Sequence, residues 1–543
     1  MAINTIYVTS VKKHQMDEIG FKISDDKDII EKYLTDESSI IKGYADSVYY
    51  PYTEAHVNKI VRDANENKVR VTVSGGGTGI TGSRVPLGGV VVSTEYMTQI
   101  STIGEDNWIE YREGGYTYVI KIGWDEEENT YYAVAPPGIT LQTLDNILAT
   151  RKLLYPPDPT EKMAFLGGTV ATNASGSRSY YYGSTREYIR RLRIVLPTGE
   201  TLDIKRGEYI IRNRVFRIES KIYGSIEIKL PKLKIPNVRK NAAGYYIKDN
   251  MDLIDLFIGS EGTLGVFTEI EVRLIPRPNI VIPLYIMFLS NEDSIDFVRE
   301  MRVFEFKNVS NVHVLSLEYY DRYSVDFIRL RYGSIIPDDT SSIIYMEMDG
   351  DDEETLIEAL QEIDDIIDYY RSNKVLASFD VDWIKLSSEI RHALPTGVNE
   401  FVRRHGTRKV ATDIAVPDDS FDEMLEYYRI IGDETGVQYV LFGHIGDNHL
   451  HFNFLPRDDN ELMKAYTGYS KLLLKAVELG GTVSAEHGVG KKKCIVDGDE
   501  VPLLELMYGK DGLIELAKLK HSFDPNHILN IGNIIPEDYL EGI

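Results

Sequence analysis

The spacing of apolar residues changes its period along the chain, and each period predicts an element. The stretch "YTEAHVNKIVRDANEN" (52–67) predicts a helix with Thr53 as its N-cap. Its apolar face consists of Val57, Ile60, Val61 and Ala64. The next stretch, "KVRVTVS" (68–74), alternates β-branched and polar residues and predicts a strand, which runs into the glycine-rich "GGGTGITG" (75–82).

The pattern changes after the two prolines of "TEIEVRLIPRP" (268–278), which indicate a domain boundary. Further on, strands are expected in "IVIPLYIMFL", "SSIIYMEMDG", "VQYVLFGHIG" and "HLHFNFL". Helices are expected at 352–370 and 459–480, the second ended by Gly480 and Gly481. This mixture predicts an α+β domain with a mostly antiparallel sheet.

The length of 543 residues requires two or three domains. We expect an N-terminal segment (1–44), a ligand-binding domain (45–278), a cap or substrate domain (279–480) and a C-terminal return (481–543). Two segments resemble insertions, 104–132 and 205–240. The second is locally basic, so it is either a solvated hairpin or a docking surface for a partner or an anionic ligand.

The charge and cysteine content exclude several classes of protein. A formal net charge of −25 argues against nucleic acid as a partner. A single cysteine, Cys494, permits no disulfide within the chain and no thiolate zinc or iron–sulfur site built by this chain alone. With no signal-peptide pattern and no apolar run long enough to span a membrane, we expect a cytoplasmic protein. Membrane association would then require a partner.

The glycine-rich stretch 75–82 allows several interpretations. It is not a P-loop, because no Gly-Lys-Ser/Thr follows. Its Gly77-x-Gly79-x-x-Gly82 pattern matches a dinucleotide fingerprint only if a helix follows, and Pro86 argues against a helix. The remaining interpretations are an ordinary turn or a nest of backbone N–H groups that binds a pyrophosphate. Two further glycine-rich segments, 154–200 and 256–276, favour a long ligand such as FAD.

The order of these motifs over residues 45–275 resembles the FAD-binding domain of the vanillyl-alcohol oxidase/p-cresol methylhydroxylase superfamily. The resemblance implies a two-subdomain FAD-binding domain of the p-cresol methylhydroxylase (PCMH) type followed by an α/β cap domain. Members of this superfamily that attach the flavin covalently often carry a histidine in the first loop. This loop has none, so the resemblance implies non-covalent FAD. The implied flavin contacts are Ser74, Gly75, Gly76, Gly77, Thr78, Gly79, Pro137, Gly138, Gly167, Gly168, Thr169, Asn173, Ser175, Gly176, Tyr182, Gly183, Glu261, Gly262, Gly265 and Asn530.

Histidines cluster in "GHIGDNHLHFNF" (443–454), although the whole chain has only 11. Alternation along the strand places His449, His451 and Asn453 on one face. A second cluster, "GGTVSAEHGVGKKK" (480–493), pairs a glutamate with a histidine between glycines. Two imidazoles and one carboxylate form a normal ligand set for an open catalytic metal site. The alternative is that these histidines are scattered over the surface and bind nothing.

These two clusters together resemble the C-terminal signature of FAD-dependent D-2-hydroxyacid dehydrogenases, which include D-lactate and D-2-hydroxyglutarate dehydrogenases and glycolate oxidase subunits. The resemblance implies that His444, His451 and Glu486 bind a divalent metal, with zinc first and manganese or iron as alternatives. It further implies that His487 is the catalytic base and Asn453 a substrate contact.

Further positions either match the family pattern or depart from it. Arg391 matches the arginine that binds the substrate carboxylate, and Lys409 is a looser match. His449 departs from the family pattern, because it replaces a polar residue, and it could be an extra ligand, a substrate selector or a bystander. The closing "FDPNHILNIGNII" retains Asn530, but Ile531 and Asn533 replace the proline and lysine of the family.

The expected reaction is oxidation of a small D-2-hydroxy carboxylate to the 2-oxo acid. Electrons would leave to an external acceptor, which could be a partner protein (an electron-transfer flavoprotein or an iron–sulfur subunit), a quinone, a dye or oxygen. A homodimer is compatible with the sequence. The alternatives are other oxidase or dehydrogenase chemistry on the same scaffold, including an ether-lipid synthase, and a non-catalytic electron-relay flavoprotein.

Overall fold

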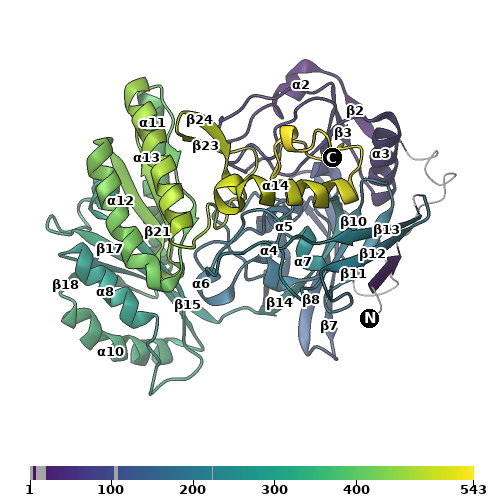
Figure 1. Ribbon diagram of the computed structural model, residues 1–543. Coiled ribbons are helices and arrows are strands. Elements are labelled where there is room, and N and C mark those ends of the chain that lie inside the picture. The colour runs from purple at the N-terminus through teal and green to yellow at the C-terminus, as the bar shows by residue number, and fades with distance from the viewer. Residues whose placement is uncertain (1–3, 8–19, 103–107, 223) are drawn as a thin grey trace.

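The computed structural model describes residues 4–7, 20–102, 108–222 and 224–543. An N-terminal part built on three sheets lies beside a second part built on one large sheet, and the last sixty residues cross between them (Figure 1). Within the described residues, no helix combines the length and apolarity needed to cross a membrane.

A small, mainly parallel sheet carries the first glycine loop. Its strand order is β2-β3-β5-β4, with β5 parallel to both β3 and β4. The strands are β2 (Lys22–Ser24), β3 (Ser47–Tyr50), β4 (Val71–Ser74) and β5 (Val90–Ser93). Helices α2 (Lys27–Glu31) and α3 (Glu54–Asn67) belong to this layer. Thr53 caps α3 by accepting a hydrogen bond from His56 N, and the predicted apolar face of the helix is buried, as expected.

The second sheet is antiparallel and has seven strands in the order β11-β10-β14-β8-β7-β6, with β9 paired to β14. They are β6 (Trp108–Glu113), β7 (Tyr116–Asp125), β8 (Thr130–Ala135), β9 (Leu153–Leu154), β10 (Ile189–Val195), β11 (Thr201–Lys205) and β14 (Val266–Pro276). Short helices α4 (Leu141–Ala149), α5 (Leu166–Thr172), α6 (Ser179–Tyr182) and α7 (Ile254–Phe257) connect these strands. The predicted insertion 104–132 therefore supplies edge strands of this sheet, while its residues 104–107 lie outside the described residues.

The basic segment 205–240 forms a hairpin of β12 (Val215–Ser220) and β13 (Gly224–Lys229), which β1 (Asn4–Tyr7) extends in parallel. One face of this hairpin is buried, and Phe216 packs against Phe523 of the C-terminal helix α14 (Leu503–Phe523) with ring centroids 6.2 Å apart. The hairpin is thus part of the core and not only a solvated ribbon.

The large sheet of the second part is antiparallel throughout, in the order β18-β15-β17-β16-β21-β22-β19, with β20 paired to β22. Its strands are β15 (Ile280–Phe288), β16 (His313–Tyr320), β17 (Ser342–Gly350), β18 (Ser372–Ala377), β19 (Val410–Ala411), β20 (Ile414–Ala415), β21 (Tyr439–His444) and β22 (His449–Phe454). This confirms the predicted sheet.

Helices cover both faces of this sheet, which explains why β17 is buried along its whole length. Side chains on one face join a core with α8 (Asn291–Met301), α10 (Glu353–Tyr369), α12 (Phe421–Thr435) and α13 (Asp459–Glu478). The other face packs on α9 (Arg322–Tyr332) and α11 (Val381–Arg404). Helix α13 ends just before Gly480, whose φ of 77° favours glycine. The turn that follows leads to the hairpin β23 (Lys493–Val496) and β24 (Asp499–Pro502).

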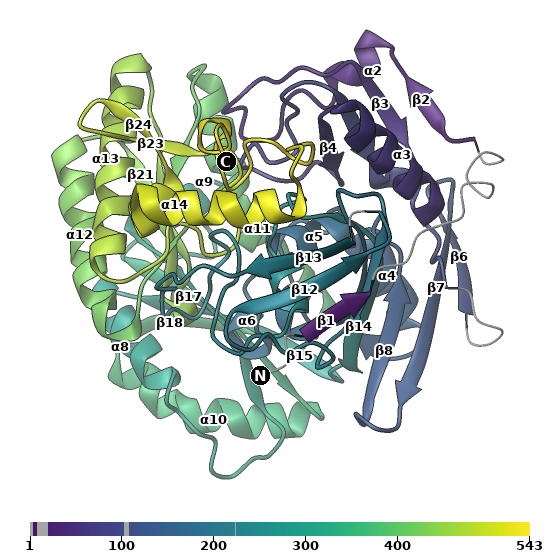
Figure 2. The same ribbon diagram turned by 45° about the vertical axis from the view of Figure 1, so that its right-hand side comes forward.

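The C-terminal return is anchored in the N-terminal part, and in both views α14 begins beside the hairpin of β23 and β24 and extends toward the N-terminal sheets (Figures 1 and 2). Val71 N of β4 donates to Ile528 O, and Asn530 N donates to Val71 O, so the return adds to the edge of the small sheet. Lys520 is fully buried, and its Nζ donates to Asp524 Oδ2 at 2.9 Å and to the carbonyls of Thr263 and Leu529.

We expect Lys520→Ala to lower the free energy of unfolding by about 3–5 kcal/mol, because it leaves the carboxylate of Asp524 buried without its cation. Lys518 lies on the same helix but forms an exposed pair with Glu515, so Lys518→Ala should cost about 0–1 kcal/mol. Denaturant unfolding of the two variants measures the difference. Equal stability of the two would show that the buried pair contributes nothing.

Candidate functional site

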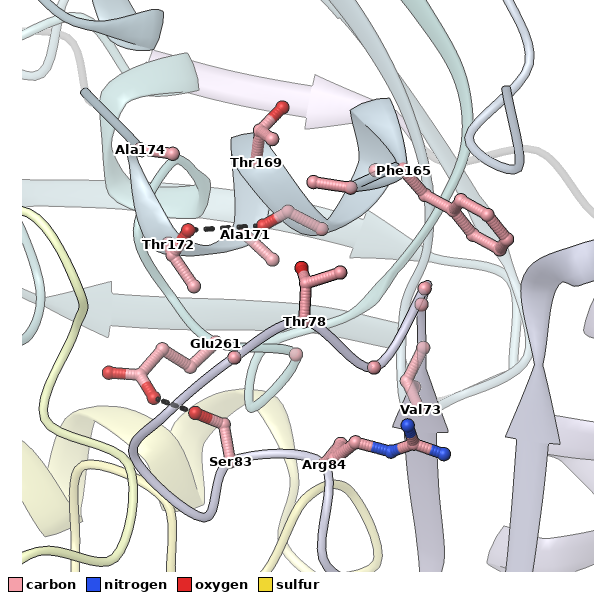
Figure 3. Close-up of a pocket in the computed structure, with 18 of the residues that line it drawn as sticks. Val73, Thr78, Ser83, Arg84, Phe165, Thr169, Ala171, Thr172, Ala174 and Glu261 are labelled. Carbon is pink, nitrogen blue, oxygen red and sulfur yellow. Dashed lines mark hydrogen bonds between the residues drawn. The ribbon is translucent and has the colours of Figure 1, made fainter. Parts of the chain in front are cut away.

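The three glycine-rich segments meet around one cavity of about 300 Å³ in the N-terminal part. Figure 3 shows the first loop, which carries Thr78 and Ser83, facing helix α5, which carries Thr169 and Thr172. The loop runs directly from β4 to β5 without a helix, as expected from Pro86. Of the predicted flavin contacts, the following line the cavity: Gly75, Gly76, Gly77, Thr78, Gly79, Pro137, Gly167, Gly168, Thr169, Ser175, Glu261, Gly262, Gly265 and Asn530.

Glu261 and Asn530 fix the walls of this cavity. The buried carboxylate of Glu261 accepts hydrogen bonds from Ser83 Oγ at 3.0 Å and from the backbone N–H groups of Val489 and Gly490. Burial raises the pKa of Glu261, and these donors oppose that shift. Asn530 accepts from Val73 N at 2.8 Å and donates to Glu261 O at 2.9 Å. The C-terminal return therefore holds two glycine loops in register.

The other predicted flavin contacts are not among the residues that line this cavity: Ser74, Gly138, Asn173, Gly176, Tyr182 and Gly183. Several are explained by packing. A Cβ at Gly138 would lie 2.2 Å from Thr94 O. Asn173 takes a left-handed conformation at the end of α5 and accepts a hydrogen bond from Arg186 N. Their contact with a flavin stays a prediction.

The predicted metal ligands come together from two distant segments. His444 and His451 on neighbouring strands approach Glu486, with His444 Nε2 3.3 Å from Glu486 Oε2 and His451 Nε2 3.4 Å from Glu486 Oε1. His449 joins them, so three imidazoles and one carboxylate offer ligand atoms that all lie within 4.8 Å of one another. This donor set suits zinc, manganese or iron.

Oxygen atoms outside the cluster hold its rings in place. Glu318 Oε1 lies 2.6 Å from His444 Nδ1, and the carbonyl of Thr412 lies 3.3 Å from His451 Nδ1. Burial opposes the charged form, but Glu318 raises the pKa of His444 to about 9. Burial and the neighbouring His451 lower the pKa of His449 to about 3.

A buried lysine also reaches the cluster. Lys240 Nζ lies 3.4 Å from Glu486 Oε2 and 3.5 Å from Asp447 Oδ2, and it donates to Gly176 O at 2.8 Å. Burial opposes ionisation, yet His444 and Lys240 keep the pKa of Glu486 well below its usual value. Lys240 therefore orients Glu486 and keeps it ionised.

His487 lines the glycine-loop cavity together with Glu486. Its Nδ1 lies 3.3 Å from Asp413 Oδ2, and its Nε2 lies 3.3 Å from Glu486 Oε1. Asp413 also accepts a hydrogen bond from the backbone N–H of His487 at 2.9 Å. Burial disfavours the imidazolium, but Asp413 and Glu486 outweigh it and raise the pKa of His487 to about 9.

Arg391 of α11 lines a second cavity of about 420 Å³, which shares Pro159 and Thr160 with the first. Its guanidinium lies 3.9 Å from Glu318 Oε2 and over the ring of Tyr345. Because Glu318 also holds His444, Arg391 is connected to the histidine cluster through one carboxylate. Arg391 is half-buried and accessible from this cavity.

Lys409 and Asn453 line neither of these two cavities. Lys409 is half-buried just before β19, and burial together with Lys492 lowers its pKa. Asn453 is buried on the strand that carries the histidines, and its Oδ1 has no hydrogen-bond partner within the described part of the chain. Their roles as substrate contacts stay predictions.

Sequence reasoning missed Glu318, Lys240 and the role of Asp413. A glutamate inside the apolar strand "HVLSLEYY" was the available signal for Glu318. Lys240 ends the basic segment that we interpreted as a hairpin or docking surface, and no local pattern shows that its side chain turns inward. Asp413 gave no signal of its own.

Two family models match the chain, one for each part of the molecule. Residues 45–205 match an FAD binding domain, and residues 288–534 match the C-terminal domain of FAD linked oxidases. A crystal structure of alkyldihydroxyacetonephosphate synthase has the same fold, with a TM-score of 0.62 at 17% identity over 94% of this chain and 82% of that chain. The predicted fold class, a PCMH-type FAD-binding domain with an α/β cap, is confirmed.

Proteins of similar sequence match nearly the whole chain. A D-lactate dehydrogenase of Anaerostipes hadrus is 29% identical, covering 93% of both chains. Glycolate oxidase subunit GlcD of Bacillus subtilis is 26% identical, covering 93% of this chain and 92% of its own. A D-2-hydroxyglutarate dehydrogenase of Stutzerimonas stutzeri is 26% identical, covering 94% and 96%. This protein is an FAD-dependent oxidoreductase. It belongs to the FAD-linked oxidase family that includes these hydroxyacid dehydrogenases.

We expect Gly168→Leu to prevent FAD binding. A Cβ at Gly168 meets no heavy atom within 4 Å, so the new side chain would occupy the cavity without displacing the protein around it. Gly76 is a poorer site for this test, since a Cβ there would lie 3.0 Å from Met163 O. Gly20→Leu is the control, because Gly20 is exposed and also has free space. Stoichiometric flavin absorbance in purified Gly168→Leu would contradict the assignment.

Proposed function

We propose that this protein oxidises a D-2-hydroxy acid, such as D-lactate, to the 2-oxo acid with non-covalently bound FAD and the help of a divalent metal. One observation carries the proposal: Glu486 and His487 line the same cavity as the three glycine loops. A candidate base and a metal ligand thus border the site that fits the flavin. The similar proteins are named for oxidations of 2-hydroxy acids, which is the same class of reaction.

The roles of the residues follow from their positions. When bound, FAD would supply a hydride acceptor. A divalent metal would be held by His444, His451 and Glu486, with zinc first and manganese or iron as alternatives. It would supply Lewis-acid polarisation of the hydroxyl group. Asp413 holds Nδ1 of His487, and its Nε2, which lies 3.3 Å from Glu486 Oε1 on the cavity side, would accept the hydroxyl proton. Arg391 would bind the carboxylate as a two-pronged donor, and Lys409 and Asn453 are further candidate substrate contacts.

The acceptor of the electrons would be external. The single cysteine cannot bind an iron–sulfur cluster in this chain. We therefore propose a redox partner, either an electron-transfer flavoprotein or an iron–sulfur subunit.

The test is a panel of D- and L-2-hydroxy acids with an artificial dye as acceptor, measured on yellow, flavin-loaded protein with and without a chelator. We expect dye reduction with at least one D-2-hydroxy acid, weak reduction with its L-enantiomer, and loss of activity after chelation with flavin still bound. Absence of dye reduction with every acid would favour a redox-neutral reaction, such as ether-lipid synthesis, or an electron-relay role. Full activity in metal-free enzyme would remove the metal from the proposal.

A further inference from the structure

His449 lies among the proposed metal ligands, although the set of two imidazoles and one carboxylate does not require it. It faces His444 directly across the β21–β22 pair and lies on the same side of β22 as His451. The ring centroids of His449 and His451 are 4.5 Å apart, and those of His449 and His444 are 5.2 Å apart. Three imidazoles therefore converge on one carboxylate, that of Glu486.

The surroundings of His449 repeat those of His444. In His444, one ring nitrogen lies 2.6 Å from the carboxylate of Glu318 and the other lies 3.3 Å from Glu486. In His449, Nε2 lies 2.9 Å from Asp413 Oδ1 and Nδ1 lies 3.9 Å from Glu486 Oε2. A metal-binding histidine commonly has its second nitrogen oriented by a carboxylate in this way.

The burial of His449 also requires an explanation. Its side chain is 0% exposed, and its Nδ1 has no hydrogen-bond partner among the residues that the structure describes. Buried polar atoms in native proteins are nearly always satisfied, and an unpaired one costs about 1–3 kcal/mol. A cation among the three rings would give Nδ1 a partner.

We propose that His449 is a fourth protein ligand, through Nδ1, of the metal at His444, His451 and Glu486. This inference rests on the proposed function, because it requires the metal. The metal would then be held by three imidazoles and one carboxylate, in place of the two imidazoles and one carboxylate of the proposed function.

The experiment measures metal binding and not activity. Flavin-loaded protein is stripped with a chelator and titrated with Zn²⁺ against a chromophoric competitor, and X-ray absorption of the zinc-loaded protein counts its imidazole ligands. His449→Asn removes the proposed fourth ligand. His444→Asn removes a ligand that the proposed function also requires, and His405→Asn is an exposed control. We expect three imidazoles in the wild type and two in His449→Asn. We also expect His449→Asn to weaken Zn²⁺ binding at least about 10–100-fold, the range seen when only a supporting contact of a metal ligand is lost.

The outcomes separate the two proposals. Two imidazoles in the wild type, together with unchanged Zn²⁺ affinity in His449→Asn, would overturn the fourth ligand, while weaker binding in His444→Asn would leave the proposed function intact. Failure of the wild type to bind Zn²⁺, Mn²⁺ or Fe²⁺ would overturn both. If His449→Asn does not fold, the imidazole count of the wild type alone decides between the two ligand sets.

Discussion

His487→Asn should reduce kcat by about 10²–10⁴, the usual loss when a general base is removed. Asparagine keeps the approximate size of the side chain but cannot accept and hold the hydroxyl proton. Flavin and metal should stay bound, because the proposed ligands His444, His451 and Glu486 are unchanged, and metal content is measured in parallel since His487 Nε2 lies 3.3 Å from Glu486. His405→Asn, on the exposed end of α11, is the matched control and should leave kcat unchanged.

The pH dependence tests the same assignment. Asp413 and Glu486 raise the pKa of His487 to about 9, so the ring is protonated and inactive as a base below that pH. The kcat/KM of the wild type should therefore rise with pH, and a bound metal ion should move this rise below pH 9 because a nearby cation disfavours the imidazolium. The rise should vanish in His487→Asn. Near-normal turnover with an unchanged profile in that variant would rule out His487 as the base.

Neutralising Asp413 should shift the pH range over which kcat/KM rises. The carboxylate of Asp413 favours protonated His487, so Asp413→Asn should lower the pKa of the ring and shift the rise of kcat/KM to lower pH. Metal content must be measured in parallel, since Asp413 also lies 2.9 Å from His449. A shift to higher pH would contradict the electrostatic assignment.

Arg391→Ala should weaken binding of the hydroxy acid by about 2–5 kcal/mol, the usual cost of truncating one partner of a buried charge pair. This corresponds to a rise in KM of roughly 30-fold to several thousand-fold. The guanidinium faces a cavity that adjoins the one lined by the glycine loops. Glu318, at 3.9 Å, neutralises only part of its charge. Arg391→Lys should recover only part of the loss, because an ammonium group lacks the planar fork.

Arg404→Ala is the control, since Arg404 is exposed on the last turn of the same helix. Its KM should equal that of the wild type. An unchanged KM in Arg391→Ala would place the carboxylate site elsewhere, and Lys409→Ala would then be the next variant to measure.

Local patterns predicted the elements that carry the site. The alternation of "HLHFNF" placed His449 and His451 on one face of a strand, and in the structure their ring centroids are 4.5 Å apart on β22. The N-cap of α3, the glycine stop of α13 and the direct passage from β4 to β5 also followed from residues within a few positions of each other. Such features depend on the backbone preferences of neighbouring residues and on the period of side-chain burial, and both can be inferred from the local sequence.

Tertiary structure alone decided which charged groups surround these histidines. Lys240, Glu318 and Asp413 come from three separate segments and meet at Glu486, His444 and His487. Nothing in the neighbouring sequence of Lys240 distinguishes it from the solvated lysines of the same basic segment. The sequence by itself determined the strands that carry these histidines, the glycine loops and the residue types of the candidate ligands. The fold determined their partners and their protonation, because both depend on burial and on charges brought together over hundreds of residues.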